Sequence, residues 1–448
     1  MRQFHWMSLS LLAGSLACAR PEPPAATATA DTTWVATSAL YEVFVQDFSP
    51  SGDLRGVMNG LDRIQQTGAN VIWLMPLHPR GILERKGVLG SPYAARDYSA
   101  IDSAFGTAAD LRALVDSAHG RGMKVIVDWV PNHTAVDNVW VTQHPDFYVH
   151  DSAGKLITPI DSKGKPTDWT DVAELDFGNP ALRRAMVDEM SRWLRDYNLD
   201  GFRVDAAGFV PYDFWRDAVP ALRAAVPRRI LLLAEWGDAE MNRLGFDLTY
   251  GWSSYSRLKA VWDSAPASSF VEQVLKDLDS VPASGRLRFT TNHDETAWDA
   301  PPVKRFKTTS GARAAFVAMA LLPGRPLLYN GQEVESPQQL GLFQREAVAW
   351  DQPDAAAARA YYTSVIDLAR KNPAFLSGTL TRVETSAPAD IIAYRRDSVL
   401  VLVNARARET RFAVTGFDVK GARSLLTAPT ISGDTVVLPG YGAAVLAH

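Results

Sequence analysis

The stretch Gly201-Phe202-Arg203-Val204-Asp205 decides how the rest of the chain is interpreted, because it predicts a short buried strand that ends on a charged pair. Side chains alternate between the two faces of a strand, so Arg203 and Asp205 are expected to point the same way. An arginine at this spacing is expected to keep Asp205 ionised at neutral pH. Such a carboxylate can act as a nucleophile toward a sugar carbon, but a structural ion pair explains this stretch alone equally well.

Short apolar strands alternate with amphipathic helical segments through most of the chain. The predicted strands cover residues 41–45, 71–75, 124–129, 201–205, 230–234, 246–248, 288–291 and 326–329. This alternation predicts an α/β fold with a parallel sheet, and eight such units fit a closed (β/α)8 TIM barrel over residues 38–372. A small inserted subdomain is expected after the third strand, at about residues 134–180. An open doubly wound sheet is the structural alternative, but no glycine-rich phosphate loop supports it.

The pattern of the sequence changes after Pro373. Apolar runs at residues 391–394, 399–403 and 435–438 are separated by turn residues. These runs predict a C-terminal antiparallel β domain of the sandwich type over residues 373–448.

The first residues have the features of an export signal. An apolar run follows a basic residue and is too short to span a bilayer as a permanent anchor. Residues 1–19 are therefore expected to be a signal peptide and residues 20–37 a flexible linker. Cys18 lies in a stretch that resembles a bacterial lipoprotein processing site, with ordinary cleavage after Ala19 as the competing interpretation. We expect an exported protein, either a periplasmic or cell-surface lipoprotein or a secreted one, that meets a membrane only through such a lipid anchor.

Composition narrows the classes of function. The chain has 448 residues, of which 47% are hydrophobic and 21% charged, and its net charge is -4. This charge balance gives no indication of a nucleic-acid-binding surface. Because Cys18 is the only cysteine, neither an internal disulfide nor thiol-based catalysis is expected. We expect a monomer that binds no nucleic acid.

Polar side chains collect where the predicted strands end, which is where a barrel of this kind has its active site. They are Asp128, Asn132 and His133 after the third strand, Arg203 and Asp205 on the fourth, Glu235 and Trp236 after the fifth, and Asn292, His293 and Asp294 after the seventh. Each residue alone has an ordinary structural explanation, such as a capping acid or a buried loop histidine. Three acids and two histidines at one end of one barrel instead predict a catalytic site.

Four of these stretches resemble the motifs of the alpha-amylase family of glycoside hydrolases. They are Asp128-Trp129-Val130-Pro131-Asn132-His133, Gly201-Phe202-Arg203-Val204-Asp205, Ala234-Glu235-Trp236 and Phe289-Thr290-Thr291-Asn292-His293-Asp294. Residues 91–98, 172–176 and 326–333 resemble further stretches of the family. The resemblance covers about residues 38–448. Each motif alone is weak, but four in this order and spacing are specific.

The resemblance implies a retaining double displacement, with Asp205 as the nucleophile and Glu235 as the general acid and base. Asp294 would stabilise the positively charged transition state. The other sugar contacts are implied for Tyr93, which would stack beneath the ring, and for His133, Arg203 and His293. Glu235 follows an apolar run and precedes Trp236, a setting expected to raise its pKa so that it is protonated at rest.

Two positions depart from the family pattern. Many members have Lys and His three and four positions after the nucleophile, where this chain has Gly208 and Phe209. The missing lysine removes a usual contact on the leaving side of the substrate, and Phe209 indicates a more apolar platform there. The missing histidine removes a residue whose carbonyl often helps to bind calcium. Calcium stays a possible cofactor, with Asn132 as a candidate oxygen ligand and Glu174 where an aspartate ligand is common.

These observations predict an alpha-amylase-type hydrolase that cleaves α-1,4-glucosidic bonds of starch, glycogen or maltooligosaccharides. An alpha-glucan transglycosylase or a trehalose-forming isomerase on the same scaffold is the enzymatic alternative, since the sequence does not show how well water competes with a sugar acceptor. A non-catalytic glucan-binding protein is a further interpretation. It predicts the loss of at least one of Asp205, Glu235 and Asp294, all of which are present.

Overall fold

The computed structural model describes residues 33–161, 163–282 and 284–448. The predicted signal peptide, Cys18 and most of the predicted linker lie outside these residues. Helix α1, Thr33–Ala36, lies inside the stretch predicted as linker, and its Trp34 side chain is buried. Packed structure therefore begins earlier than residue 38.

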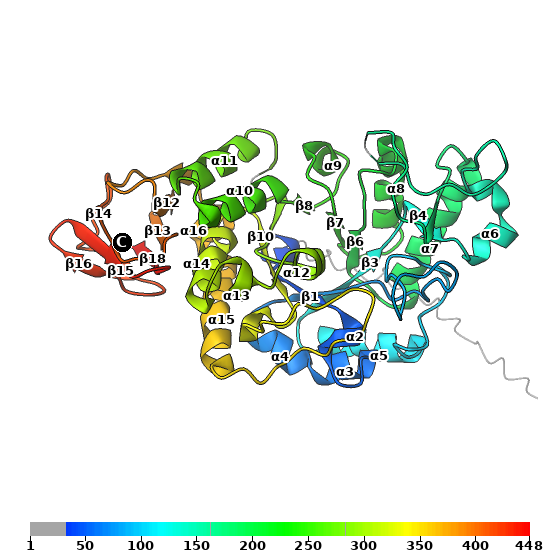
Figure 1. Cartoon of the computed structure of the whole chain (residues 1–448), viewed down its shortest axis with the longest axis horizontal. Coiled ribbons are helices and arrows are strands. Elements are labelled where there is room, and N and C mark those ends of the chain that lie inside the picture. The colour runs from blue at the N-terminus through cyan, green and yellow to red at the C-terminus, as the bar shows by residue number, and fades with distance from the viewer. Residues whose placement is uncertain (1–32, 162, 283) are drawn as a thin grey trace, which may run out of the picture. The chain divides into compact units, whose positions relative to one another are not determined.

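Eight of the described strands close into a parallel barrel in the order β1-β10-β9-β8-β7-β6-β3-β2 (Figure 1). Their bounds are β1 Leu40–Val43, β2 Val71–Leu74, β3 Lys124–Trp129, β6 Gly201–Val204, β7 Leu231–Ala234, β8 Leu248–Tyr250, β9 Arg286–Arg288 and β10 Arg325–Tyr329. The predicted (β/α)8 barrel is confirmed. The sixth strand lies two residues later than expected, and the seventh begins two residues earlier.

The barrel strands are short runs that are buried on both faces. Apart from Lys124 at the start of β3, every residue in them is buried. Burial on both faces is typical of parallel strands, because crossover helices cover the outside of the barrel while side chains fill its interior. Glu42, Asp128 and Arg203 are among the charged residues on these strands that are fully buried as well. A buried charge needs a partner, so these residues indicate where polar groups meet inside the barrel.

Helices follow the strands and surround the barrel (Figure 1). After β1 to β6 they are α2 Val45–Phe48, α3 Leu54–Asn59, α4 Leu61–Gln66, α5 Ala108–His119, α7 Pro180–Asp196 and α8 Tyr212–Ala224. After β7 to β10 they are α9 Ala239–Arg243, α10 Trp252–Asp263, α11 Ser268–Leu278, α12 His293–Trp298, α13 Pro302–Arg305, α14 Thr309–Ala320, the 3-10 turn η2 Gln332–Val334 and α15 Ala355–Lys371.

Helix α7 shows the local reasons for such a helix. Asn179 caps it by accepting a hydrogen bond from the backbone N–H of Ala181 at 2.8 Å, and Pro180 occupies the first turn, where no N–H is needed. Its buried side chains recur every three or four residues, at Leu182, Met186, Met190, Trp193 and Leu194. This apolar stripe packs against the barrel and leaves the polar residues outside.

The subdomain predicted after the third strand is a β-hairpin with irregular loops. Strands β4, His133–Ala135, and β5, Val172–Glu174, pair antiparallel, with His133 opposite Glu174. Helix α6, Val139–Gln143, and the turn η1, Pro145–Phe147, lie between them. The hairpin brings His133 back to the carboxyl end of the barrel, directly after β3.

The C-terminal region begins with helix α16, Pro373–Ser377, so its first strand starts later than the boundary predicted at residue 373. One sheet has the order β11-β12-β13-β18-β15 and the other β14-β17-β16. The strands are β11 Leu380–Arg382, β12 Ile391–Arg396, β13 Val399–Asn404, β14 Thr410–Ala413, β15 Arg423–Ser424, β16 Thr430–Ser432, β17 Thr435–Leu438 and β18 Ala443–Ala447. Apolar residues of both sheets, such as Leu402 and Val436, share one core. Both sheets are antiparallel, as the sandwich prediction requires.

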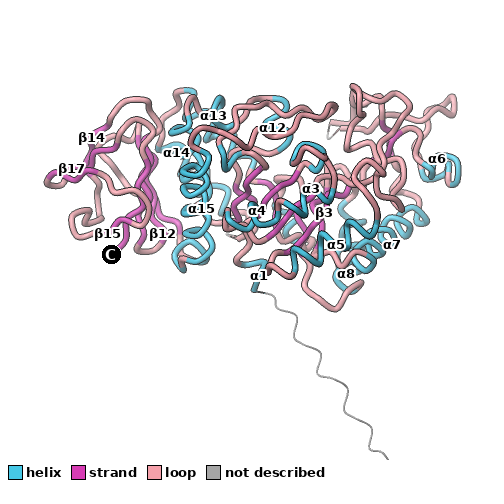
Figure 2. The backbone as a smooth tube through the Cα atoms, turned by 90° about the horizontal axis from the view of Figure 1, so that it is seen from below, coloured by secondary structure: helices cyan, strands magenta, loops and turns pink. Residues whose placement is uncertain are grey.

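Helices α14 and α15 lie between the barrel and the C-terminal sheets (Figure 2). Tyr394 on β12 donates a hydrogen bond to the carbonyl of Ala318 at 3.1 Å, and Arg396 donates to that of Leu321 at 3.0 Å. The sheets are thus bound to the end of α14 by polar contacts as well as apolar packing. In the part of the chain that the structure describes, no helix is long and apolar enough to span a membrane.

Replacement of Gly201 by alanine is predicted to destabilise the barrel. Gly201 has a φ of 145°, and a Cβ atom there would lie 1.9 Å from the carbonyl oxygen of Leu231 on β7. We expect Gly201→Ala to lower the free energy of unfolding by about 2 kcal/mol or more. Gly122→Ala is the control, because Gly122 also has a positive φ but no atom lies within 4 Å of its Cβ position. Urea unfolding that shows equal losses in both variants would contradict the explanation.

Candidate active site

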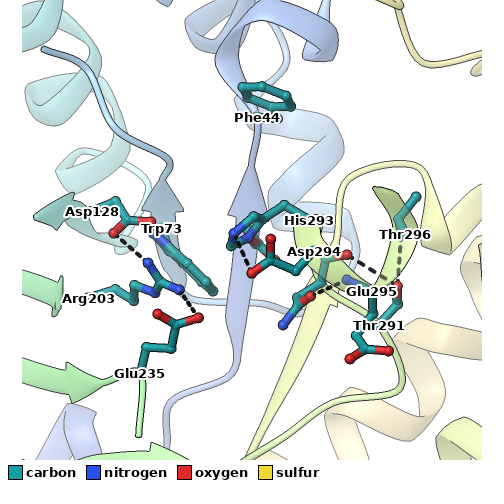
Figure 3. A network of polar contacts seen from close by, with 12 residues as sticks. Phe44, Trp73, Asp128, Arg203, Glu235, Thr291, His293, Asp294, Glu295 and Thr296 are labelled. Carbon is teal, nitrogen blue, oxygen red and sulfur yellow. Dashed lines mark hydrogen bonds and ion pairs between the residues drawn. The ribbon is translucent and has the colours of Figure 1, made fainter. Parts of the chain in front are cut away.

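Arg203 on β6 is the centre of the site (Figure 3). Its guanidinium is fully buried and donates hydrogen bonds to Asp128 Oδ1 at 2.8 Å and Asp205 Oδ1 at 2.9 Å. It also forms an ion pair with Glu235 Oε1 at 2.8 Å. These three acids stand at the ends of β3, β6 and β7, which are neighbours in the barrel. One buried cation thus holds three carboxyl groups together.

Asp205 follows β6 directly and is almost completely buried. Its contact with Arg203 confirms that the two side chains share a face of the strand. Arg203 lowers the pKa of Asp205, as the sequence predicts, but other effects oppose it. Burial raises the pKa of Asp205 well above its usual range, and the charge of Glu235 raises it further, which outweighs the lowering effect of Arg203.

Glu235 follows β7 and has polar partners on two sides. Besides its ion pair with Arg203, its Oε2 accepts a hydrogen bond from the backbone N–H of Ala206 at 2.8 Å. The apolar setting predicted for this carboxyl group is therefore wrong. The apolar residues Leu231 to Ala234 precede it in sequence, but its contacts come from the neighbouring strand end.

Asp128 is the fully buried partner of Arg203. Its Oδ2 accepts hydrogen bonds from Trp73 Nε1 at 3.3 Å and from the hydroxyl of Tyr93 at 3.1 Å. Burial raises the pKa of Asp128 to about 6, and the charge of Arg203 opposes this shift. Asp128 therefore anchors both the guanidinium and the Tyr93 ring from below.

His293 opens helix α12 and lies between two acids. Its Nδ1 contacts Glu42 Oε1 on β1, and its Nε2 lies 3.2 Å from Asp294 Oδ2 and 2.7 Å from the hydroxyl of Tyr93. Burial lowers the pKa of His293, but the charges of Asp294 and Glu42 outweigh burial and raise it well above its usual value. In turn, burial raises the pKa of Asp294, but the His293 charge outweighs it and brings that pKa below the usual value. His293 and Asp294 thus form an ion pair beside the Arg203 cluster (Figure 3).

A cavity at the carboxyl end of the barrel brings together five of the predicted site residues. It is lined by Tyr93, His133, Asp205, Glu235 and Asp294, and also by Trp169 from the inserted hairpin. The Tyr93 ring stacks on His293 with the ring centres 5.3 Å apart. Burial lowers the pKa of His133 to about 4, so its imidazole is neutral at neutral pH. A cavity walled by carboxyl groups, a neutral imidazole and aromatic rings suits a polar, ring-shaped ligand.

Two of the predicted substrate contacts lie elsewhere. Arg203 and His293 are fully buried and do not line the cavity. They instead contact the three acids that do line it, which are Asp205, Glu235 and Asp294. Sequence reasoning also missed Glu42, the second acid of His293. Its signal was a charged residue inside an otherwise apolar strand, Leu40–Val43.

The rim of the cavity contains further residues that sequence reasoning missed. Lys86 and Asp171 form an ion pair at 3.2 Å that joins the loop after β2 to the inserted hairpin. Trp298 on α12 is 66% exposed and lies 5.8 Å from Phe343, ring centre to ring centre. No family motif quoted above contains these four residues, and they shape the entrance rather than the floor.

The calcium prediction is neither supported nor opposed by the contacts of its candidate ligands. Asn132 is buried, and its Nδ2 lies 3.4 Å from His133 Nδ1. Glu174 accepts a hydrogen bond from the backbone N–H of Ile160 at 3.1 Å, and burial raises its pKa to about 7. Across the described residues, no group of three His, Cys, Asp or Glu side chains lies close enough to hold a metal ion. Calcium binding stays a prediction.

Known proteins resemble this chain over most of the barrel or more. A family model of the alpha-amylase catalytic domain matches residues 26–239. Alpha-amylase MalA of Haloarcula japonica is 27% identical over 406 residues, which cover 84% of this chain and 56% of that protein. The trehalose synthase/amylase TreS of Mycobacterium tuberculosis is 33% identical over 224 residues, 43% of this chain and 36% of that protein. The chain thus spans only part of the length of these relatives.

A solved structure extends the similarity to the C-terminal sheets. The alpha-amylase of Lactobacillus plantarum has a TM-score of 0.80 and 29% identity, with 93% of this chain and all of that chain covered. The family model, these relatives and the motif residues gathered at one end of the barrel agree. The chain belongs to the alpha-amylase family of glycoside hydrolases.

Proposed function

We propose that the protein is a retaining hydrolase that cleaves α-1,4-glucosidic bonds of starch, glycogen or maltooligosaccharides. The observation that carries this proposal is the arrangement of Asp205 and Glu235. They stand at the ends of adjacent strands, bind the same guanidinium and open into the same cavity. Two carboxyl groups beside one glycosidic bond are what a double displacement requires.

In the first step Asp205 attacks the anomeric carbon, and the bond from that carbon to the leaving oxygen breaks. Glu235 gives its proton to this oxygen. In the second step Glu235 takes a proton from water, whose oxygen attacks the anomeric carbon and breaks the bond to Asp205. The first step requires that Asp205 and Glu235 together carry one proton. Burial and then the charge of Glu235 raise the pKa of Asp205, which favours such a shared proton.

Three neighbouring residues support the reacting sugar in this proposal. Asp294 is held ionised by His293, so its charge can stabilise the positive charge that develops on the ring. Tyr93, fixed through its hydroxyl by Asp128, offers a ring face to the sugar. Neutral His133 can donate or accept a hydrogen bond to a hydroxyl group.

The substrate class rests on the names of the relatives. MalA and the Lactobacillus plantarum protein are alpha-amylases, and TreS is a trehalose synthase as well as an amylase. TreS therefore supports the alternative of a transglycosylase or a trehalose-forming isomerase. This alternative shares the first step, but in its second step a sugar hydroxyl rather than water attacks the anomeric carbon. Export, acylation at Cys18 and a monomeric state stay proposals from the sequence.

Products from maltoheptaose should show shorter maltooligosaccharides whose new ends have the α configuration, as proton NMR can follow. Glu235→Gln should lower kcat by about 10²- to 10⁴-fold, because it removes the general acid. Glu189→Gln is the control, since Glu189 on α7 does not line the cavity and pairs with Arg192; its kcat should stay within about two-fold. Early products longer than the substrate would favour the transferase, and an active Glu235→Gln would contradict the assigned role.

The acid limb of the pH profile should move in Glu235→Gln. Asp205 must be ionised to attack, so the first step is lost as the pH falls through its pKa, which burial and then the charge of Glu235 raise. Removing that charge lowers the pKa of Asp205 and shifts the limb to lower pH. The burst of fluoride release from α-maltosyl fluoride measures this step, because fluoride leaves without a general acid. A limb that stays in place or moves to higher pH would contradict the electrostatic explanation.

A further inference from the structure

The loops at the carboxyl end of the barrel wall the cavity unevenly. The loop after β2, the inserted hairpin and the loop after β10 line it with residues far beyond the strand ends, such as Lys86, Asp171 and Phe343. The loops after β6 and β7 line it only with the one or two residues that directly follow each strand. None of the described residues in the loop after β8 lines it. The cavity therefore has one high side and one low side.

Residues 81–90 of the loop after β2, which we call the β2 loop, are tied to the inserted hairpin. Lys86 Nζ lies 3.2 Å from Asp171 Oδ1, and Asp171 is buried. Water screens such a partly buried ion pair less than it screens a pair on the surface. The backbone N–H of Ile82 also donates a hydrogen bond to Asp137 Oδ2 at 3.0 Å. The β2 loop and the hairpin are thus joined into one wall.

The other end of the β2 loop is tied to the loop after β10. The backbone N–H of Leu89 donates a hydrogen bond to the carbonyl of Phe343 at 3.0 Å. Gly87 lies so close that a Cβ atom on it would be 2.6 Å from Cβ of Phe343. The Phe343 ring in turn lies 5.8 Å from the ring of Trp298, whose side chain is hydrogen-bonded to Asp294. The wall thus continues from the hairpin to Asp294.

This wall stands on the side of the cavity that holds the reacting sugar in the proposed function. Burial lowers the pKa of His133 and the charge of Lys86 lowers it further, so the ammonium group lies near that imidazole. His133 and Asp294 are both assigned to the reacting sugar. Glu235 must come within hydrogen-bond distance of the leaving oxygen, and it stands on the low side. The high side therefore faces the reacting sugar, and the low side faces the leaving group.

The direction of a glucan chain in the cavity follows from these positions. Asp205 attacks C1 of the reacting sugar, so the chain beyond the leaving oxygen runs toward the reducing end. The chain on the reacting side runs toward the non-reducing end, and a long one would have to cross the wall. The cavity has a volume of about 230 Å³, which is smaller than the pockets of about 300–1,000 Å³ that take drug-sized ligands. It has room for a short chain end only.

We propose that the β2 loop, held by the Lys86–Asp171 ion pair and by Phe343, closes the reacting side of the cavity. The enzyme then acts on free non-reducing ends and removes one or two sugars at a time, rather than cutting in mid-chain. This inference rests on the proposed hydrolase function and names the part of the glucan that the site takes. Lys86 and Phe343 determine this specificity by excluding a longer chain, without contact with the reacting atoms.

The test compares maltoheptaose with maltoheptaose whose non-reducing end carries a 4,6-O-benzylidene group, and chromatography of the products gives kcat/KM for each. In the wild type the ratio of kcat/KM for the blocked to the free substrate should be about 0.01 or less, because the blocked end does not fit a closed cavity. Lys86→Ala releases the β2 loop from the hairpin, and Phe343→Ala loosens it from the loop after β10. Each variant should raise the ratio about 10-fold, whereas Lys86→Arg, which keeps the ion pair, should not.

Lys371→Ala is the matched control, because Lys371 on α15 forms an ion pair with Asp367 at 2.8 Å and does not line the cavity. Its ratio should equal that of the wild type. A wild-type ratio near one overturns the closed side while the hydrolase stands. An unchanged ratio in both Lys86→Ala and Phe343→Ala overturns the role of these two residues. Wild-type protein that releases fluoride from neither α-maltosyl nor α-glucosyl fluoride overturns the proposed function itself.

Discussion

The buried guanidinium of Arg203 is the interaction on which the site depends. A charge without solvent costs several kcal/mol unless it is paired, and here it is paired with Asp128, Asp205 and Glu235 at once. The arrangement also restricts the positions of the three acids, because a carboxylate oxygen of each one must stay in contact with the planar guanidinium. One cation is shared by three carboxyl groups, and burial and then the charge of Glu235 raise the pKa of both Asp205 and Asp128. Geometry and protonation therefore have one common cause.

The barrel supplies the frame for this cation. Parallel strands bring their carboxyl ends to one edge, so short motifs distant in sequence meet there. Because each strand is buried on both faces, its apolar residues are easy to recognise in sequence. Among the charged residues of the strands, Glu42, Asp128 and Arg203 take part in the ion pairs of the site. The fold and the location of the site were accordingly predictable from the sequence.

What the sequence did not predict are contacts between segments. Glu235 follows four apolar residues, yet its partners are Arg203 on β6 and Ala206 just after β6. The residues that precede Glu235 in sequence therefore do not indicate what surrounds its side chain. Glu42 and His293 are separated by 251 positions. Phe209 was recognised as apolar, but its place between Trp169 and Trp236 depends on a hairpin and on the small size of Gly208. Strand boundaries shifted by about two residues for a similar reason, because register is set by pairing.

The pairing of β1 with β10 has a consequence for how the molecule is made. Leu40 pairs with Leu327, and Tyr41 donates a hydrogen bond to Glu333 at 2.6 Å. The first barrel strand therefore completes its pairing only with residues that lie nearly three hundred positions later in the chain. Such long-range closure is slow and leaves strand edges open in the meantime, which favours association with other chains. Since Glu42 on β1 completes the surroundings of His293, a ring that has not closed lacks part of its site. The recovery of enzymatic turnover during refolding would therefore report the closure of the barrel by pairing of β1 with β10.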